Sequence, residues 1–257
     1  MITLLSPAKK LSKDCFAHTN HYTKPQFLDK SKYLVESLKK IDPLEYMSLM
    51  NISESLAILN WERMQRWGID FKSNNSREAI FSFSGDTYTG LDANSLSSED
   101  VNFSDSNIRI LSGLYGILKP LDLVMPYRLE MGTKLVNKHG KNLYEYWNNI
   151  LTDSINDDLK SHETKTIINC ASLEYFKSIK RKKLNAKVVT PQFKDWKNGE
   201  LKIISFFAKK ARGMMARFII INRIENENDI HNFNLGGYNY ESKLSTPLEP
   251  VFTRNSA

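Results

Sequence analysis

Five short stretches of the chain combine turn-forming residues with side chains that can bind a ligand or transfer a proton. They are residues 6–9, 85–90, 112–116, 126–131 and 169–175. Carboxylate, hydroxyl and guanidinium groups supply acid, base and hydrogen-bonding chemistry, and glycine permits tight turns beside a ligand. The candidate catalytic residues in these stretches are Asp86, Arg128, Glu130, Ser172 and Glu174, and the candidate pocket residues are Ser6, Lys9, Tyr88, Tyr115 and Asn169.

Each stretch also has an ordinary interpretation as a turn, because Gly, Ser, Asp and Asn are the residues that turns require. Arg128 and Glu130 lie two positions apart on an extended segment. Their side chains therefore point the same way and can form an ion pair without catalytic purpose. Residues 113–119 lack the spacing of a phosphate-binding loop. Residue types alone thus leave both a ligand pocket and a set of turns open.

Metal and nucleophile chemistry have weaker support in the sequence. Cys15, His18 and His21 stand three residues apart, but no fourth ligand is evident near them. Cys170 follows an apolar run, so we expect a packed thiol rather than a catalytic one. We therefore expect no metal and no cofactor.

Positive charge is concentrated in residues 177–223. This segment holds 14 of the 36 Lys and Arg residues and two of the 29 Asp and Glu residues, so it carries more than the whole net charge of +7. Such a concentration predicts a polyanionic partner, and a solvated surface that aids solubility is the other interpretation. The candidate nucleic-acid-binding cations are Lys177, Lys180, Arg181, Lys182, Lys183, Lys209, Lys210, Arg212 and Arg217.

The elements that must position these residues follow from hydrophobic periodicity. We expect strands at residues 2–5, 80–84, 108–111 and 166–168, and helices at residues 25–41, 43–50, 53–67, 143–159 and 208–224. Residues 91–106 are polar and are expected to form an excursion. Asn198 and Gly199 predict a two-residue hairpin between residues 193–196 and 201–207. Strands interleaved with helices indicate a mixed α/β fold, with one domain over residues 1–257 and a central mixed sheet flanked by helices.

Residues 43–67 contain a second candidate for phosphate binding. Asn51, Ile52 and Ser53 join two expected helices, with the spacing of the helix-hairpin-helix motif h-P-G-h-G-x-x-x-A. In that motif the backbone amides of the turn hold a DNA phosphate. Asn tolerates positive φ and Ser is a good N-cap, whereas Glu54 would repel a phosphate. A plain helical hairpin is the alternative.

Composition excludes several classes of protein. Hydrophobic residues make up 41% and charged residues 25% of the chain, which excludes wholesale disorder and coiled coil. No apolar run reaches the ~18 residues that a membrane span requires. Two cysteines and an N-terminus without a signal-peptide core predict a cytoplasmic protein.

The motifs taken together resemble the YaaA family of peroxide-stress-resistance proteins. The matching stretches are residues 6–9, 85–91, 111–122, 126–132, 169–176 and 208–220. The resemblance implies a cytoplasmic domain of unusual α/β fold with a helix-hairpin-helix element and a positive cleft. It also implies binding to double-stranded DNA and a response to hydrogen peroxide that limits unincorporated iron. By position, the hairpin would be residues 51–53, and the cleft cations would be the groups at 177–183 and 209–217.

Two functions from different classes follow. The first is a non-enzymatic protein that binds duplex DNA largely without sequence specificity and prefers bent or distorted duplex. The alternative is an enzyme that acts on a nucleobase, nucleoside or damaged base in a polar pocket beside the basic cleft. Convergence of the candidate catalytic side chains would favour the enzyme, and mutual ion pairing would count against it. No iron-ligand group stands out, so we do not predict that the protein itself binds iron.

Overall fold

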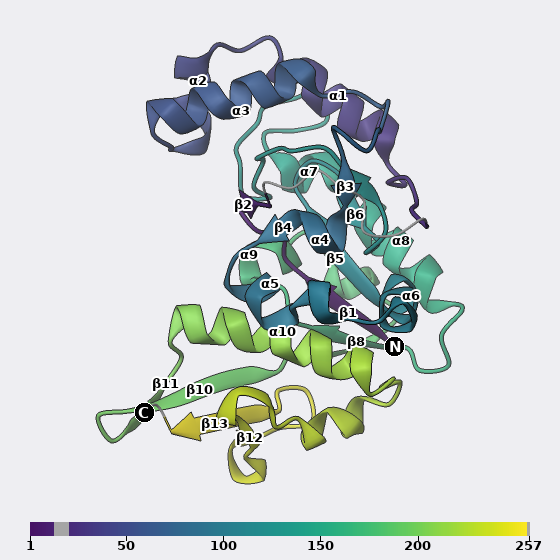
Figure 1. The fold of residues 1–257 in the computed structure, drawn as a ribbon, viewed down its shortest axis with the longest axis vertical. Helices are drawn as coiled ribbons and strands as arrows, with labels where there is room; N and C mark the ends of the chain where they lie inside the picture. Colours follow the sequence, from purple (N-terminus) through teal and green to yellow (C-terminus); the bar gives the residue numbers. More distant parts are fainter. Residues whose placement is uncertain (13–20, 256–257) are drawn as a thin grey trace.

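The largest sheet of the computed structural model, which describes residues 1–12 and 21–255, has five strands in the order β6-β5-β1-β8-β9 (Figure 1). β1 is parallel to β5 and β8, β9 is parallel to β8, and β6 is antiparallel to β5. The sheet is therefore mixed, as predicted. Its strands are β1 (Ile2–Leu5), β5 (Ile108–Ser112), β6 (Gly116–Leu118), β8 (Thr166–Asn169) and β9 (Lys187–Val189).

A second sheet of four strands, which the sequence did not predict, has the order β11-β10-β13-β12. Asn198 and Gly199 have φ angles of 54° and 77° and form the predicted two-residue turn between β10 and β11. The second strand of this hairpin ends at Lys202 and does not extend to residue 207 as expected, because α10 begins at Ser205. The strands are β10 (Gln192–Lys197), β11 (Glu200–Lys202), β12 (Asn239–Tyr240) and β13 (Val251–Asn255).

Two short antiparallel pairs complete the strands of the described chain: β2 with β4 and β3 with β7. The expected strand at residues 80–84 is largely wrong, because a short helix occupies its first part. This short helix is α4 (Ala79–Ser82). The paired strands are β2 (Lys10–Leu11), β3 (Arg77–Glu78), β4 (Phe83–Ser84) and β7 (Leu123–Val124).

Three helices lie together at one end of the molecule (Figure 1). They are α1 (Leu28–Leu38), α2 (Pro43–Met50) and α3 (Glu54–Arg66), close to the predicted bounds. Asp42 and Glu45 form a reciprocal capping box at the start of α2, which fixes the chain between α1 and α2.

Helix α10 (Ser205–Ile221) contacts β1 of the first sheet and β10 of the second, and it packs against α5 (Asp86–Leu91) (Figure 1). Glycine makes the crossing with α5 possible. A Cβ at Gly213 would lie 1.7 Å from the carbonyl oxygen of Thr87, and one at Gly90 would lie 2.0 Å from that of Lys210. The two helix backbones are therefore in direct contact.

Two expectations about the middle of the chain were wrong. The polar stretch at residues 91–106 contains η1 (Ala93–Ser95) and most of α6 (Ser98–Asn107), which a capping box between Ser97 and Asp100 starts. The helix expected at 143–159 is two helices, α7 (Leu143–Trp147) and α8 (Ile150–Leu159). Asn148, with φ 42° and ψ −117°, breaks it.

The remaining elements are short. They are α9 (Leu173–Phe176), η2 (Arg181–Lys183), η3 (Glu227–Asn232), η4 (Leu235–Gly237) and η5 (Ser242–Leu244). Buried apolar side chains from both larger sheets belong to one hydrophobic cluster. Within residues 1–12 and 21–255, no helix has the length and apolar character to cross a membrane.

Candidate functional site

A hollow of about 450 Å³ opens where β1, β4 and β8 end beside α10, and we call it the strand-end cavity. β1 and β8 are adjacent and parallel, so the loops that follow them emerge at the same edge of the sheet. Three of the five polar stretches picked out in the sequence meet here. The lining residues are Ser6, Pro7, Ala8, Lys9, Lys10, Ser84, Gly85, Asp86, Thr87, Cys170, Ser172, Glu174, Tyr175, Lys209 and Arg212.

Two serines connect the loops after β1 and β8. The backbone N–H of Ser172 donates to Ser6 Oγ at 2.8 Å, and Ser6 Oγ donates to Ser172 Oγ at 3.3 Å. The hydroxyl of Tyr88 donates to the carbonyl oxygen of Ser6 at 3.1 Å. Since Ser6 Oγ–H points to Ser172, the hydroxyl proton of Ser172 is left to donate into the cavity.

The two carboxylates of the cavity differ in their partners. Glu174 Oε1 accepts a hydrogen bond from the backbone N–H of Gly132 at 2.9 Å. Asp86 is exposed at the start of α5, and no ion pair among the described residues includes it. Asp86 therefore keeps all its acceptor capacity for a ligand.

Arg128 and Glu130 form the ion pair that their spacing allowed. Arg128 Nε and Nη2 each lie 2.9 Å from Glu130 Oε1, and Lys9 Nζ lies 3.5 Å from the same oxygen. Neither Arg128 nor Glu130 lines the cavity, and Glu130 contacts the lining residue Lys9. Glu130 Oε2 is buried and has no hydrogen-bond partner in the described part of the chain.

Cys170 and Tyr175 contribute neutral groups to the cavity wall. Burial raises the pKa of the Cys170 thiol to about 12, against a smaller opposing effect of Arg212. Burial also raises the pKa of Tyr175 well above its ordinary value. Both groups therefore stay protonated at neutral pH, and Cys170 is packed rather than activated, as expected from the sequence.

Lys209 and Arg212 bring positive charge to the cavity from α10. None of the ion pairs among the described residues includes either side chain. Lys210 is exposed on the same helix but does not line the cavity. Because α10 is held by its backbone contact with α5, these cations stand on a rigid support.

Arg217 has a different place from the one predicted. Its Nη1 donates to the carbonyl oxygens of Leu91 and Asp92 at 3.0 and 2.8 Å, and lies 3.7 Å from the Asp92 carboxylate. Arg217 therefore holds the C-terminal end of α5, and we remove it from the candidate phosphate contacts.

The cations of residues 177–183 lie at another place. Lys177 and Lys180 line a separate hollow beside α7, where Lys177 Nζ lies 5.2 Å from the centre of the Tyr144 ring. Arg181, Lys182 and Lys183 form η2, are exposed and contact α8. The basic segment thus presents two groups of cations. Its other cations include three that pair with carboxylates: Lys187 with Glu227, Lys202 with Glu200 and Arg223 with Asp100.

The turn between α2 and α3 includes one residue with positive φ, a conformation that Asn tolerates. Asn51 has φ 49°, and the N–H of Ile52 donates to the carbonyl of Met47 at 3.2 Å. Ser53 occupies the N-cap position of α3, but its side chain makes no capping hydrogen bond. The hairpin lies at the upper end of the molecule and α10 lies below the middle (Figure 1), and Asn51–Ser53 are not among the residues that line the strand-end cavity.

Three predicted pocket residues do not line the cavity. Tyr115 is fully buried, and its hydroxyl accepts hydrogen bonds from Trp67 Nε1 and the N–H of Met125 at 2.8 and 3.1 Å. Asn169 Oδ1 accepts from the N–H of Ala171 at 3.2 Å, which shapes the loop after β8. Tyr88, described above, holds Ser6.

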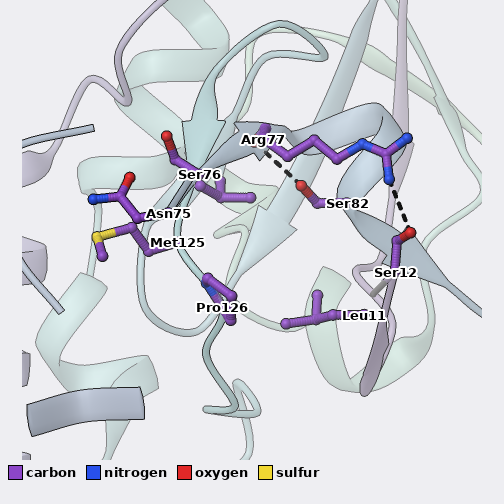
Figure 2. A pocket seen from close by; sticks show the side chains of 9 residues that line it. Leu11, Ser12, Asn75, Ser76, Arg77, Ser82, Met125 and Pro126 are labelled. Carbon is purple, nitrogen blue, oxygen red and sulfur yellow. Dashed lines mark hydrogen bonds between the residues drawn. The ribbon is translucent and has the colours of Figure 1, made fainter. Parts of the chain in front are cut away.

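Figure 2 shows a smaller hollow, of about 20 Å³. Arg77 Nη1 donates to Ser12 Oγ at 2.8 Å, and Ser82 Oγ donates to the Arg77 carbonyl at 3.1 Å. This volume holds about one water molecule. The hollow is therefore part of the packing around β2 and β4.

The Cys15, His18 and His21 triplet cannot be placed, since Cys15 and His18 lie outside the described residues. Among residues 1–12 and 21–255, no group of three or more His, Cys, Asp or Glu side chains is arranged to hold a metal ion.

Comparison with known proteins decides the family. The family model for peroxide stress protein YaaA matches residues 1–244. The chain belongs to the YaaA family. It is 51% identical over the full length of both chains to a UPF0246 protein of Colwellia psychrerythraea. It is 48% identical to UPF0246 proteins of Aliivibrio fischeri and Shewanella woodyi, in each case over 99% of this chain and at least 98% of the relative. The resemblance read from the sequence is thus confirmed.

Sequence reasoning missed some features of this YaaA-family site. Lys10 lines the cavity beside the predicted Lys9, and Gly90 and Gly213 bring α5 against α10. A glycine within a helical pattern was the available signal for the crossing. The partner across the crossing could not be found, because the two glycines are more than 100 positions apart in the chain.

Proposed function

We propose that this protein acts in the response to hydrogen peroxide, in the cytoplasm, by binding double-stranded DNA through backbone phosphates. Membership of the YaaA family supports the peroxide response. The observation that carries DNA binding is the position of Lys209 and Arg212, which no described carboxylate neutralises, on the rigid helix α10. Phosphate contacts of this kind supply affinity without reading base sequence. Lys177, Lys180 and the cations of η2 are a second group that a duplex can contact.

The test is the salt dependence of duplex affinity. Neutralised phosphates release counterions, so the logarithm of affinity falls with the logarithm of salt concentration by about 0.9 per phosphate contacted. Changing Lys209, Lys210 and Arg212 together to Ala should lower the affinity and reduce this slope by about 2–3.

A charge-matched control separates local contact from general charge. Lys72 and Lys160 pair with nearby aspartates, and Lys243 is exposed elsewhere, so Lys72→Ala, Lys160→Ala and Lys243→Ala remove the same charge at other places. The control should keep most of the affinity and slope. Equal losses in both triple variants would show that α10 makes no specific phosphate contact.

Limitation of free intracellular iron is the second part of this proposal, and it is what the resemblance described in the sequence analysis implies. If DNA binding is the route, cells that lack the protein should contain more unincorporated iron under peroxide. The wild-type chain should then lower that level, and the Lys209, Lys210 and Arg212 variant should not. Full rescue by the variant would separate iron control from DNA binding.

A second candidate function is an enzyme acting on a nucleobase, nucleoside or damaged base. The favouring observation is that Asp86, Ser172 and Glu174 line one cavity of about 450 Å³, within the range of about 300–1,000 Å³ for small-ligand sites. Arg128 and Glu130 are occupied by their ion pair and count against a larger catalytic set. Incubation with nucleosides and with damaged-base oligonucleotides, followed by chromatography, tests this function. Product formed by wild type and lost in Asp86→Asn would support it, and no turnover on any substrate would exclude it.

A further inference from the structure

We propose that the strand-end cavity binds a phosphomonoester, the group carried by the ends of nucleic-acid strands and by free nucleotides. The inference deepens the proposed DNA-binding function and rests on it for the nucleic-acid source of the phosphate. A terminal phosphate, rather than the continuous backbone, would then be the preferred contact of this site.

Charge favours a monoester over a diester. Four cations and two carboxylates line the cavity: Lys9, Lys10, Lys209 and Arg212 against Asp86 and Glu174. Lys9 is partly neutralised by Glu130, whereas Lys209 and Arg212 have no described carboxylate partner. A phosphomonoester carries about −1.5 to −2 at pH 7, whereas a backbone diester carries about −1. The two positive charges of Lys209 and Arg212 therefore balance the charge of a monoester more closely than that of a diester.

Hydrogen-bond donors in the cavity suit the same group. The guanidinium of Arg212 can bind two phosphate oxygens at once, and Lys209 supplies a point charge one helical turn away. Ser172 can donate its hydroxyl proton, because Ser6 fixes it from the other side. The thiol of Cys170 is protonated and adds no negative charge to the wall.

The remaining carboxylate has a role that fits a nucleotide. Asp86 stands on a different element from Lys209 and Arg212 and has no described ion-pair partner. A carboxylate accepts hydrogen bonds from hydroxyl groups. Asp86 therefore suits a sugar hydroxyl of the terminal nucleotide, while the cations hold its phosphate.

The shape of the cavity also favours the terminal phosphate of a strand over a phosphate inside the strand. Loops after three strands and one helix surround it, so a terminal group can enter it end-on. A phosphate inside a duplex has nucleotides on both sides, which keeps it at the rim. The backbone contact of α5 with α10 at Gly90 and Gly213 holds the walls in place. Selection therefore follows from charge and from access together.

The test compares one short duplex in three forms, with a 5′-phosphate, with a 3′-phosphate and with hydroxyl ends only. At near-physiological salt, the full chain should bind at least one phosphorylated form about tenfold more tightly than the hydroxyl form, as expected for an added charge-assisted contact. Lys209→Ala and Ser172→Ala should each bring this ratio close to one. Thermal melting by circular dichroism checks that both variants fold.

A matched control is Lys182→Ala with Lys183→Ala, exposed cations of η2 outside the cavity. It should weaken all three duplexes to the same extent and leave their ratio unchanged. Equal wild-type affinity for all three forms would overturn the inference while leaving salt-dependent DNA binding intact.

Competition separates the two sources of the phosphate. A nucleoside monophosphate should displace the phosphorylated duplex, and the matching nucleoside should not. Binding of the monophosphate without any duplex binding would support the cavity site and overturn the DNA-binding function. Failure of the monophosphate and of every duplex to bind would overturn both.

Discussion

Arg217 donates two hydrogen bonds from a single guanidinium nitrogen to the last carbonyl oxygens of α5. These carbonyls have no partner within the helix, and a cation at a helix C-terminus also interacts favourably with the helix dipole. The residue thus stabilises the wall of the strand-end cavity without contacting a ligand.

Arg217→Ala should therefore lower the free energy of unfolding by about 1–3 kcal/mol, since a partly buried, charge-assisted contact is lost. Urea unfolding measures this change. Duplex affinity should stay within about twofold of wild type under conditions where the variant is folded. A large loss of affinity with unchanged stability would return Arg217 to the phosphate contacts.

Cys170 leads to a prediction about pH and reactivity. Its folded pKa of about 12 lies above the ordinary value of 9.0, so the fold disfavours the thiolate. Stability is unaffected at neutral pH and should fall as pH rises above about 9, where the unfolded thiol ionises. In a Cys15→Ser background, alkylation of the native protein should be at least ~100-fold slower than in urea. Rapid alkylation of the native protein, or rapid oxidation by peroxide, would contradict the buried thiol.

At the scale of elements, the crossing of α5 and α10 determines the cavity. Asp86 and Thr87 come from one helix, and Lys209 and Arg212 from the other. The distance between these walls is fixed by two glycines, at which the backbones touch. Packing of the two helices thereby determines the electrostatics of the site.

Gly213→Ala tests this crossing. The added Cβ would lie 1.7 Å from the Thr87 carbonyl oxygen, so the helices must separate, at a cost of about 3 kcal/mol or more. Gly68→Ala is the matched control, because nothing lies within 4 Å of its Cβ position, and it should change stability by less than about 0.5 kcal/mol. Urea unfolding compares the two, and similar effects would show that the crossing is loose.

If the protein binds DNA as proposed, contact with the α2–α3 hairpin should depend on the shape of the duplex. The hairpin lies at the upper end of the molecule, whereas α10 lies below the middle, with the second sheet beyond it (Figure 1). The hairpin and α10 would therefore contact separated stretches of the proposed DNA partner. A bent duplex should therefore bind more tightly than a straight one. Glu54, in the first turn of α3, repels phosphate there, so Glu54→Gln should raise affinity for the bent duplex about two- to fivefold. No change for either duplex would leave this element a plain helical hairpin.

At the scale of the whole molecule, both larger sheets contribute to one hydrophobic cluster. We therefore expect one cooperative unfolding transition in urea, which would support the single domain predicted from the sequence. Tryptophan fluorescence reports on the surroundings of side chains such as Trp147 in the core and Trp196 on β10. Far-ultraviolet circular dichroism reports on the helices and strands of the whole chain. Coincident curves are the expected result, and two separate transitions would indicate two folding units.

Local signals predicted much of this architecture. Asp42-Pro43, Asn198-Gly199 and the apolar run at residues 2–5 each act through neighbouring residues, and the structure has the elements they predict. Three of the five polar stretches singled out in the sequence line the strand-end cavity, whereas residues 112–116 and 126–131 do not. These features depend on backbone preference and on the pattern of apolar residues, and both can be read from a short stretch of sequence.

The rest depended on contacts between distant parts of the chain. Phe83 and Ser84 form a strand only where β2 pairs with them, and the preceding residues turn into a helix. Arg217 appears from its spacing to be a surface cation, and its real partner lies 126 positions away. Leu56 and Leu59 are both about 40% exposed, because the buried side of α3 carries Ala57, Asn60 and Met64.

Helix α10 touches both larger sheets and α5, so it is anchored along several sides. Among the described residues, these contacts leave no hinge by which the wall that carries Lys209 and Arg212 could swing over a ligand. Capture of the proposed phosphate would then proceed by rotation of these two side chains, a motion that takes picoseconds to nanoseconds in exposed residues. Association should accordingly be limited by diffusion and long-range attraction, with a rate that falls as ionic strength rises. Residence time, in contrast, would be set by the few contacts inside the hollow.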